Sequence, residues 1–374
     1  MRILQLGKFY PVLGGVEKVM FDFTSGLSEA GVECDMMCAT SDGRGSEVIE
    51  LNPHGRVVCC KTWLKKARTT IAPSMITKLR RMEDWYDIIH IHHPDPMAAM
   101  ALMLSGFRGK VVLHWHSDIL SQKTLLKFYL PIQNWLIKRA DAIVGTSPVY
   151  LAESPYLQKV QDKTRCIPIG IVPNRSDIAK VQSIRNEYAG RKIIFSLGRL
   201  VEYKGYRYLI EAAKYLDDSH IILIGGGGPL KDELQSQIDG LGVGNRVKLL
   251  GKVSDEDLPS YYGACDLFCL SSIMKTEAFG IVQIEAMSEG RPLIATKIPA
   301  SGVAWVNEDG VSGINVAPRD GRAIAEAILA ITKDPETWTR FSEGSRRRFA
   351  ENFTKEKMLA DCRRLYAELL GEQA

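Results

Sequence analysis

The sequence has no uninterrupted apolar run of the roughly eighteen residues that a membrane-spanning helix requires. The run that comes nearest, MAAMALMLSGF at 97–107, stops well short of that length. The opening MRILQLGKFYP contains only a short apolar-leaning stretch, which predicts a first strand rather than a signal peptide. We therefore expect a cytoplasmic protein, either free or bound at the inner face of the plasma membrane.

Several chemical signatures are missing as well. None of the 8 cysteines shows the CxxC spacing of zinc or redox sites, which favours buried, reduced thiols. The GxGxxG pattern of a nicotinamide-binding domain is absent, because Gly7 is followed by six other residues before Gly14. No carboxylate cluster suggests a magnesium site. A net charge of only +4, without a recognised reading module, argues against nucleic-acid binding.

Two series of apolar strands alternate with helical segments along the 374 residues. Such a length usually forms two domains, and strands separated by helices predict parallel, doubly wound sheets. We expect one α/β domain at 1–175, a second at 190–354, and a Pro- and Gly-rich linker between the two series, with a ligand site in the cleft that the two face. The predicted strands lie at 2–6, 32–40, 86–93, 110–116 and 140–147, then at 192–198, 220–227, 246–251, 265–271 and 291–296.

Two segments suit phosphate groups. Gly14 and Gly15 lead from the first strand into a helix, where backbone amides can approach an anion. Arg199 and Lys204 follow the buried strand KIIFSLG, and a guanidinium with an ammonium suits a diphosphate. Without a magnesium cage, these two cations would themselves neutralise a leaving diphosphate. Either pair alone could equally be an ordinary turn or surface feature.

The segment TEAFGIVQIEAMSEGRPLIAT at 276–296 carries two glutamates around an apolar run. A helix is predicted to begin at Phe279-Gly280-Ile281 and to end near residue 287, which leaves Glu277 in the preceding loop and Glu285 inside the helix. Free amides at a helix start bind phosphate or sugar oxygens, and carboxylates accept hydrogen bonds from vicinal hydroxyls. Glu277 could therefore hold a sugar and Glu285 a ribose.

Five of the 7 histidines fall in HIHH (90–93) and HWH (114–116), at the ends of two predicted strands. Zinc binding is one reading, since histidine is the commonest metal ligand. No nearby carboxylate or thiol completes a ligand set, so we expect core packing for most of these residues and no metal. His116, with Asp118 just beyond the strand, is the best candidate to reach a cleft.

The segment 61–81, KTWLKKARTTIAPSMITKLRR, carries seven basic residues and no acidic one, with apolar residues between them. Such a segment suits an anionic membrane surface. The two alternatives for this segment are therefore peripheral membrane contact and a solvated basic loop.

Together these motifs resemble the retaining GT-B glycosyltransferases of family 4, and the resemblance covers essentially the whole chain. TEAFGIVQIEAMSEGRPLIAT matches the family's E-x7-E segment, SLGRLVEYKG its Gly-Arg…Lys-Gly clamp, GGVEK its glycine loop and HWHSD its acceptor-side histidine. Four motifs in the family's order are far more specific than any one of them.

The resemblance implies a nucleotide-sugar donor on the second domain, with its base near Val253 and its ribose on Glu285. Arg199 and Lys204 would stabilise the diphosphate, and Glu277 would orient the transferred sugar. Backbone amides of residues 279–281 and of the Gly14–Gly15 loop would complete the oxyanion site.

The resemblance also implies retention of stereochemistry without a protein nucleophile, with no metal and no other cofactor. His116 would assist proton removal from a saccharide or lipid-linked acceptor, with Asp118 on the same side. The C-terminal helix, 355–374, would cross back to the first domain.

The clamp and E-x7-E segments resemble those of transferases from bacterial surface-polysaccharide and lipopolysaccharide (O-antigen) gene clusters. We expect a mannosyltransferase that uses GDP-mannose. UDP-linked glucose, galactose or N-acetylhexosamine are alternatives, as are a phosphorylase or epimerase of the same architecture and a non-catalytic subunit that binds nucleotide-sugar.

Overall fold

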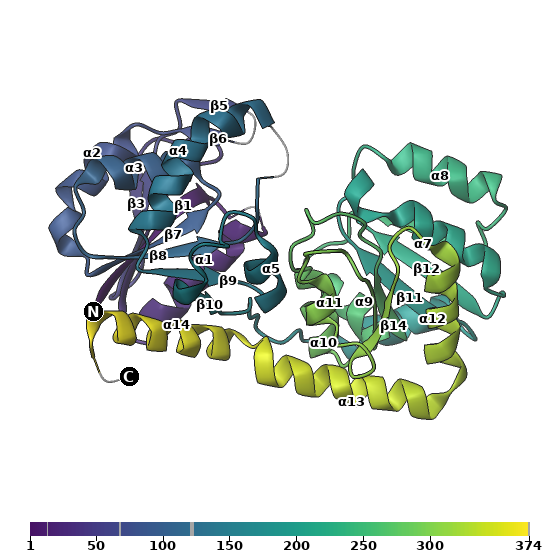
Figure 1. The fold of residues 1–374 in the computed structure, drawn as a ribbon. Helices are drawn as coiled ribbons and strands as arrows, with labels where there is room; N and C mark the ends of the chain where they lie inside the picture. Colours follow the sequence, from purple (N-terminus) through teal and green to yellow (C-terminus); the bar gives the residue numbers. More distant parts are fainter. Residues whose placement is uncertain (13, 67–68, 120–122, 373–374) are drawn as a thin grey trace. The chain divides into compact units, whose positions relative to one another are not determined.

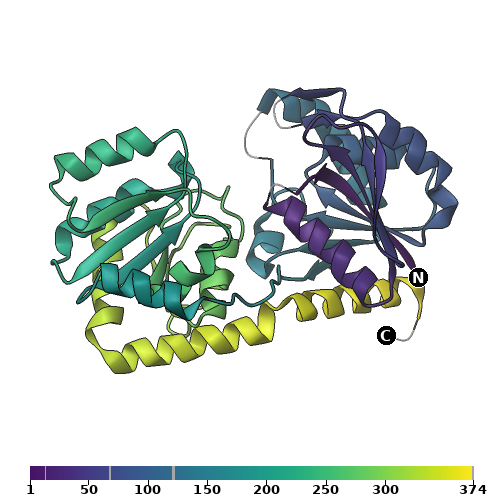
Figure 2. The same ribbon diagram turned by 180° about the vertical axis from the view of Figure 1, so that it is seen from behind.

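The structure is a computed structural model that describes residues 1–12, 14–66, 69–119 and 123–372. The chain forms two compact units (Figures 1 and 2). The first comprises Met1–Ile169 together with Lys355–Ala374, and the second comprises Gly170–Thr354. Each unit is a sheet of mainly parallel strands covered by helices, which is the doubly wound architecture predicted from the sequence.

The first unit contains an 8-stranded sheet in which all neighbouring pairs are parallel except β3 with β4. A separate antiparallel hairpin pairs β5 (Leu64–Lys66) with β6 (Thr69–Ile71). The order across the main sheet is β10 (Thr164–Cys166), β9 (Ala142–Gly145), β8 (Lys110–Trp115), β7 (Ile88–His93), β1 (Arg2–Tyr10), β2 (Glu33–Thr40), β4 (Gly55–Cys60) and β3 (Glu47–Asn52).

The helices of this unit include one from each end of the chain. Gly26 of α1 lies where a Cβ would come within 2.4 Å of Leu359 Cδ1 of α14, so the lack of a side chain lets the two helices pack closely. The α-helices are α1 (Val16–Glu29), α2 (Ser74–Arg81), α3 (Pro96–Ser105), α4 (Lys123–Arg139), α5 (Pro148–Glu153) and α14 (Lys355–Leu370), with 3-10 turns at Glu83–Trp85 and Gln161–Lys163.

The second unit contains a 6-stranded sheet that is parallel throughout. Its strand order is β13 (Val247–Gly251), β12 (His220–Gly225), β11 (Lys192–Leu197), β14 (Leu267–Leu270), β15 (Leu293–Thr296) and β16 (Gly313–Val316). Its helices are α6 (Ile178–Glu187), α7 (Tyr206–Ala212), α8 (Lys231–Gly240), α9 (Leu258–Ala264), α10 (Ile281–Ser288), α11 (Val303–Val306), α12 (Gly321–Lys333) and α13 (Pro335–Asn352), with 3-10 turns at Glu202–Lys204 and Ala213–Tyr215.

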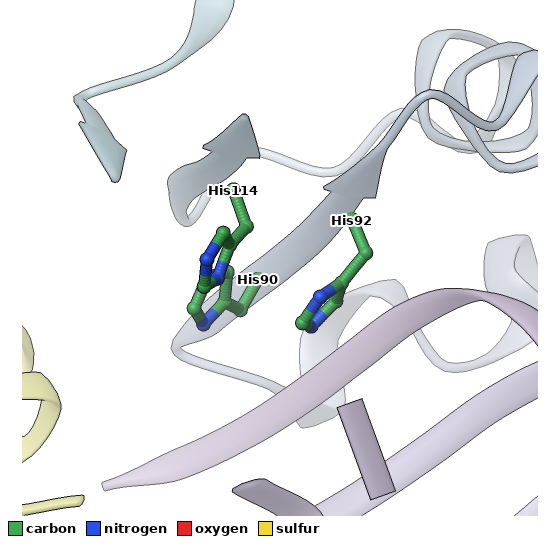
Figure 3. A group of neighbouring side chains, drawn as sticks. All are labelled: His90, His92 and His114. Carbon is green, nitrogen blue, oxygen red and sulfur yellow. The ribbon is translucent and has the colours of Figure 1, made fainter. Parts of the chain in front are cut away.

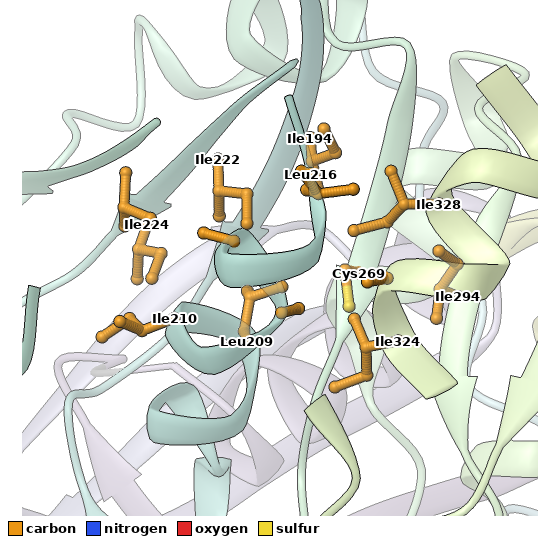
Figure 4. Close-up of a cluster of buried hydrophobic side chains, with 14 of the residues drawn as sticks. Ile194, Leu209, Ile210, Leu216, Ile222, Ile224, Cys269, Ile294, Ile324 and Ile328 are labelled. Carbon is orange, nitrogen blue, oxygen red and sulfur yellow. The ribbon is translucent and has the colours of Figure 1, made fainter. Parts of the chain in front are cut away.

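The core of the second unit is built from branched aliphatic side chains of the strands and of the helices that cover them. Ile194, Ile222 and Ile294 come from three strands, and Leu209 and Ile328 from two helices, all at most 1% exposed (Figure 4). Strands buried on both faces carry continuous apolar runs, which is why both strand series were visible in the sequence.

The linker expected at 166–192 is wrong in its second half. Residues 178–187 form α6, which packs on α9 within the second unit. Asp177 caps this helix by accepting hydrogen bonds from the amides of Ala179 and Lys180 at 2.8 and 3.1 Å. An aspartate cap outweighs the general Pro- and Gly-rich composition of the surrounding segment.

The cysteines are free thiols, as predicted, but burial holds for seven of them. Cys166 is the exception and is exposed on the edge strand β10. The edge strands β3, β10 and β16 were not predicted, because they are short or carry few apolar residues. The inner strand β4 and the short strands β5 and β6 were missed as well. None of the described helices combines the length and the apolar character needed to cross a bilayer.

Candidate functional site

In the second unit, the direction of strand addition reverses between β11 and β14. The chain places β12 and β13 on one side of β11, then returns to add β14, β15 and β16 on the other. Ligands of doubly wound sheets bind at the carboxyl ends of the strands at such a switch point. The segments that follow β11 and β14 carry Lys204 and Glu277.

Lys204 and Glu277 form a nearly buried ion pair at this position. The Lys204 Nζ lies 2.5 Å from Glu277 Oε2, and the two side chains are 10% and 12% exposed. The Ser272 hydroxyl donates to the same oxygen at 3.0 Å. Gly205 has φ +66°, and a Cβ there would lie 2.2 Å from Ser271 O, so a glycine is needed for the turn that carries Lys204 close to β14.

Arg199 follows the same strand but remains outside this pair. Its side chain is exposed, and it makes no ion pair with any residue of the described ranges. Val253, the predicted base contact, is half-buried and follows β13, two strands away from β11. The structure therefore brings Lys204 and Glu277 together. Arg199 and Val253 also follow the carboxyl ends of strands in this sheet, but neither takes part in the ion pair.

The predicted helix after Phe279 is confirmed as α10, which runs from Ile281 to Ser288. Gly280 caps it with φ +80°, and Phe279 is buried. Glu285 lies inside the helix, where its Oε2 accepts a hydrogen bond of 2.6 Å from the Tyr262 hydroxyl. Tyr262 is fully buried, and burial together with the Glu285 charge raises its pKa well above the usual range, so the phenol keeps its proton and donates.

In the first unit, the corresponding reversal falls between β1 and β7. Gly14 and Gly15 follow β1, with φ +116° and +60°, and a Cβ on Gly14 would meet no described atom within 4 Å. Gly15 is the residue before α1 and forms no side-chain cap, which leaves that helix start open to an anion. The glycine turn between β1 and α1 is therefore present, and its binding of an anion stays a prediction.

His116 lies just beyond β8 and is 5% exposed. Its Nε2 lies 2.9 Å from His92 Nδ1. Burial is the main cause that lowers the His116 pKa well below 6.5, with His114, His92 and Lys8 adding to it, so the ring is neutral at physiological pH.

Asp118, also predicted on the acceptor side, is engaged in holding its own loop. Its Oδ1 accepts from the Trp115 indole at 2.9 Å and from the Ser154 hydroxyl at 2.7 Å. Its backbone amide donates to the Tyr150 hydroxyl at 2.8 Å. These contacts give Asp118 a structural role in the loop that follows His116.

The two histidine motifs form one buried cluster across β7 and β8. Candidate ligand nitrogens of His90, His92 and His114 lie within 4.8 Å of one another (Figure 3). The three rings stack on each other with interplanar angles of 11–20°. Imidazole lone pairs lie in the ring plane, so stacked rings do not aim them at a common ion. Both nitrogens of His92 and Nδ1 of His90 are also already hydrogen-bonded. The arrangement fits core packing better than a zinc site.

Two family models match the chain, one to each half. Residues 177–348 match Glycosyl transferases group 1, and residues 13–175 match Glycosyltransferase Family 4. The O-antigen chain mannosyltransferase C of Escherichia coli is 34% identical over 379 residues, covering 100% of both chains. The chain belongs to glycosyltransferase family 4. The D-rhamnosyltransferase WbpZ of Pseudomonas aeruginosa is also similar, at 30% identity over 95% of this chain and 92% of its own.

Solved structures share the GT-B fold of this family. HepE from Anabaena, crystallised with UDP, superposes with a TM-score of 0.79 at 21% identity, covering 98% of this chain and 100% of its own. Sucrose-phosphate synthase from Thermosynechococcus elongatus gives the same TM-score at 22% identity, covering 99% and 100%. The fold class predicted from the sequence, two Rossmann-like domains, is confirmed.

Some residues of this glycosyltransferase site were missed at the sequence level. Ser272 and Tyr262 contact the two glutamates, yet neither belongs to a motif, and their roles depend on strands that pair only in the fold. Gln5 was passed over as one polar residue within an apolar strand. Its interruption of the apolar run RILQL is the signal that could have singled it out, because a polar group within a buried strand needs hydrogen-bond partners.

Proposed function

We propose that this glycosyltransferase moves a mannosyl unit from GDP-mannose to a saccharide or lipid-linked saccharide during synthesis of a cell-surface polysaccharide. The sugar and the pathway are suggested by the O-antigen chain mannosyltransferase that is similar over its full length. Phosphatidyl-myo-inositol mannosyltransferases of Mycobacterium leprae and Mycolicibacterium smegmatis are more distantly similar, at 27% identity. We place the enzyme in the cytoplasm, where it meets the nucleotide-sugar.

The observation that carries the proposal is the Lys204–Glu277 pair at the switch point of the second unit. A nearly buried ammonium beside a carboxylate offers one group for a diphosphate and one for sugar hydroxyls. When donor binds, the diphosphate would take hydrogen bonds from Lys204 and from the exposed Arg199. Glu277, still held by Ser272, would accept hydrogen bonds from the sugar.

The charge on the departing diphosphate would then be stabilised by these cations and by the first amides of α10, without a divalent ion. Glu285, oriented by Tyr262, would hold the ribose. With Glu285 assigned to the ribose and Glu277 to the sugar hydroxyls, neither carboxylate is assigned as a nucleophile, so we propose same-face attack through an oxocarbenium-like state, with retention of stereochemistry.

The first unit would receive the acceptor near His116, with the Gly14–Gly15 loop offering amides to an anionic group.

We also propose that this unit touches the membrane. Trp63, just before β5, and Leu64, its first residue, are 73% and 52% exposed, and the last turn of α2 carries Lys78, Arg80 and Arg81. Residues 67–68 of the basic segment lie outside the described residues. Anionic vesicles should retain the protein at low salt and release it at high salt, and Trp63→Ser should weaken retention. Equal binding to neutral vesicles would contradict this contact.

A thermal-shift and transfer panel tests the donor. A ligand that binds only the folded protein, present at one hundred times its Kd, stabilises by about 2.7 kcal/mol. We expect GDP and GDP-mannose to raise the Tm more than UDP and UDP-sugars, and labelled mannose to reach product only when acceptor extract is present. A response to UDP compounds alone would contradict the donor. Product formed without acceptor would indicate an epimerase, and turnover that requires free phosphate would indicate a phosphorylase. Binding without any turnover would support a non-catalytic subunit.

A further inference from the structure

A continuous chain of hydrogen bonds connects His116 with the C-terminal helix inside the first unit. His116 Nε2 lies 2.9 Å from His92 Nδ1, and His92 Nε2 lies 2.8 Å from Gln5 Oε1. The Gln5 Nε2 donates to the Tyr366 hydroxyl at 3.1 Å, and that hydroxyl lies 2.5 Å from His90 Nδ1. The chain of hydrogen bonds runs from the residue just beyond β8 across β7 and β1 to Tyr366 of α14, and from there back to His90 of β7.

The amide of Gln5 gives this chain a direction. Its oxygen can only accept, so the Nε2 of His92 must carry a proton. A neutral His92 then has a lone pair on Nδ1, which accepts a hydrogen bond from the N–H of His116 Nε2. At the other end, the Tyr366 hydroxyl accepts a hydrogen bond from the Gln5 amide and can donate one to His90 Nδ1.

The surroundings keep both rings neutral, so one tautomer of each is selected. Burial lowers the pKa of His92 and of His116 well below 6.5. Lys8 from β1, His90 from β7 and His114 from β8 lower both further, because each would repel an imidazolium. Gln5 and His92 are both 0% exposed, which shields the chain from competing water.

We infer that Gln5 and His92 are positioning residues that hold His116 in the Nε2–H tautomer. This leaves the lone pair on His116 Nδ1, an atom that accepts no hydrogen bond from any residue in the described part of the chain. An acceptor hydroxyl could then donate its hydrogen bond to Nδ1. The opposite tautomer would present an N–H to the hydroxyl and could not accept its proton. The value of this arrangement for catalysis rests on the proposed role of His116, whereas the tautomer itself does not.

The test is to read the tautomer directly by long-range proton–nitrogen correlation NMR on full-length protein labelled with ¹⁵N-histidine. In the wild type, we expect His116, assigned through His116→Asn, to show a protonated Nε2 and a bare Nδ1 from about pH 6 to 8. Gln5→Leu removes the fixed acceptor, so both His116 tautomers should become populated. Tyr366→Phe, which frees the Gln5 amide to turn over, should give a smaller change in the same direction.

Phe23→Leu is the matched control. Phe23 is fully buried and packs its ring 5.5 Å from His90 and 6.3 Å from His92 without a side-chain hydrogen bond, so its loss should disturb packing but leave the tautomer unchanged. In transfer assays, Gln5→Leu should lower kcat about tenfold while leaving the donor KM unchanged.

A protonated Nδ1 on His116 in the wild type would overturn the inference, as would an unchanged tautomer in folded Gln5→Leu protein. If His116→Asn transfers sugar as well as wild type while the tautomer is as expected, the proposed role of His116 fails and the positioning chain stands. If the tautomer is wrong while His116→Asn is inactive, the proposed function stands and the inference fails.

Discussion

The two glutamates of the E-x7-E segment are set in place by neighbours that differ in chemistry. Glu277 is held by a cation and a hydroxyl, at 2.5 and 3.0 Å. Glu285 is held by a buried phenol at 2.6 Å. A carboxylate paired with Lys204 can exchange that partner for a ligand when the diphosphate draws the ammonium away. A carboxylate held by a neutral donor keeps its orientation whether or not a ligand is bound.

This difference leads to a prediction for Tyr262→Phe. Loss of the phenol removes one hydrogen bond to a charged group, so Glu285 should be oriented less firmly, and the Kd for donor should rise about tenfold, corresponding to about 1.4 kcal/mol. Because a ribose contact is the same before and during the reaction, kcat should stay within about twofold. Isothermal titration with GDP and steady-state kinetics measure the two quantities.

Tyr261→Phe, at the neighbouring position, is the control. The Tyr261 ring stacks on Phe195 with ring centroids 5.5 Å apart, whereas the hydroxyl that donates to Glu285 belongs to Tyr262. A Tyr262→Phe enzyme that binds GDP like the Tyr261→Phe enzyme would contradict the role assigned to Tyr262.

At the scale of elements, the motifs could be placed on the correct strands and helices from sequence alone. Both strand series were visible because central parallel strands are apolar on both faces. The start of α10 was also predictable, because Gly280 marks it. The contacts between motifs were not, since Lys204 and Glu277 meet only because β11 pairs with β14 rather than with β13. Strand order is a property of the whole sheet and leaves no local trace in the sequence.

The strands β7 and β8 carry a stack of buried histidines that should make the first unit sensitive to acid. Burial lowers the pKa of five histidines, that of His114 to about 3. The unfolded chain, with pKa values near 6.5, therefore binds more protons than the folded one below that pH. Stability present above pH 6.5 is thus lost as the pH falls, by about 1.4 kcal/mol per pH unit for each histidine.

The measurement is a urea titration at pH 7.5 and 5.5, read by pulsed hydrogen exchange in peptides covering β7 and β8. His114→Leu removes one buried ring whose two nitrogens have no hydrogen-bond partner among the described residues. Between pH 6.5 and 5.5, the free energy of unfolding of the variant should fall by about 1.4 kcal/mol less than that of wild type. Equal acid losses in the two proteins would show that these histidines are not kept neutral by the fold.

At the scale of the whole molecule, the family and its fold follow from the sequence, and the similarity to relatives over their full length agrees. The identity of the donor base does not follow from the sequence. A residue such as Val253 is predicted to read it through backbone atoms, and backbone contacts are the same for every side chain. The hydrogen-bond chain through Gln5 was equally hidden, because it joins residues 5, 92, 116 and 366, which no local pattern connects.

We propose that Lys204, with Arg199, stabilises the departing diphosphate without magnesium, in place of the divalent ion that other enzymes use for this step. The most direct measurement is the rate of mannosyl transfer from GDP-mannose in excess EDTA and in excess Mg²⁺, for wild type, Lys204→Ala and the surface control Lys231→Ala. We expect equal rates with and without chelator for wild type and control, and a 10²–10³-fold loss of kcat in Lys204→Ala that Mg²⁺ does not restore. Wild-type turnover that stops in EDTA and returns with Mg²⁺, or a Lys204→Ala enzyme as fast as wild type, would contradict it.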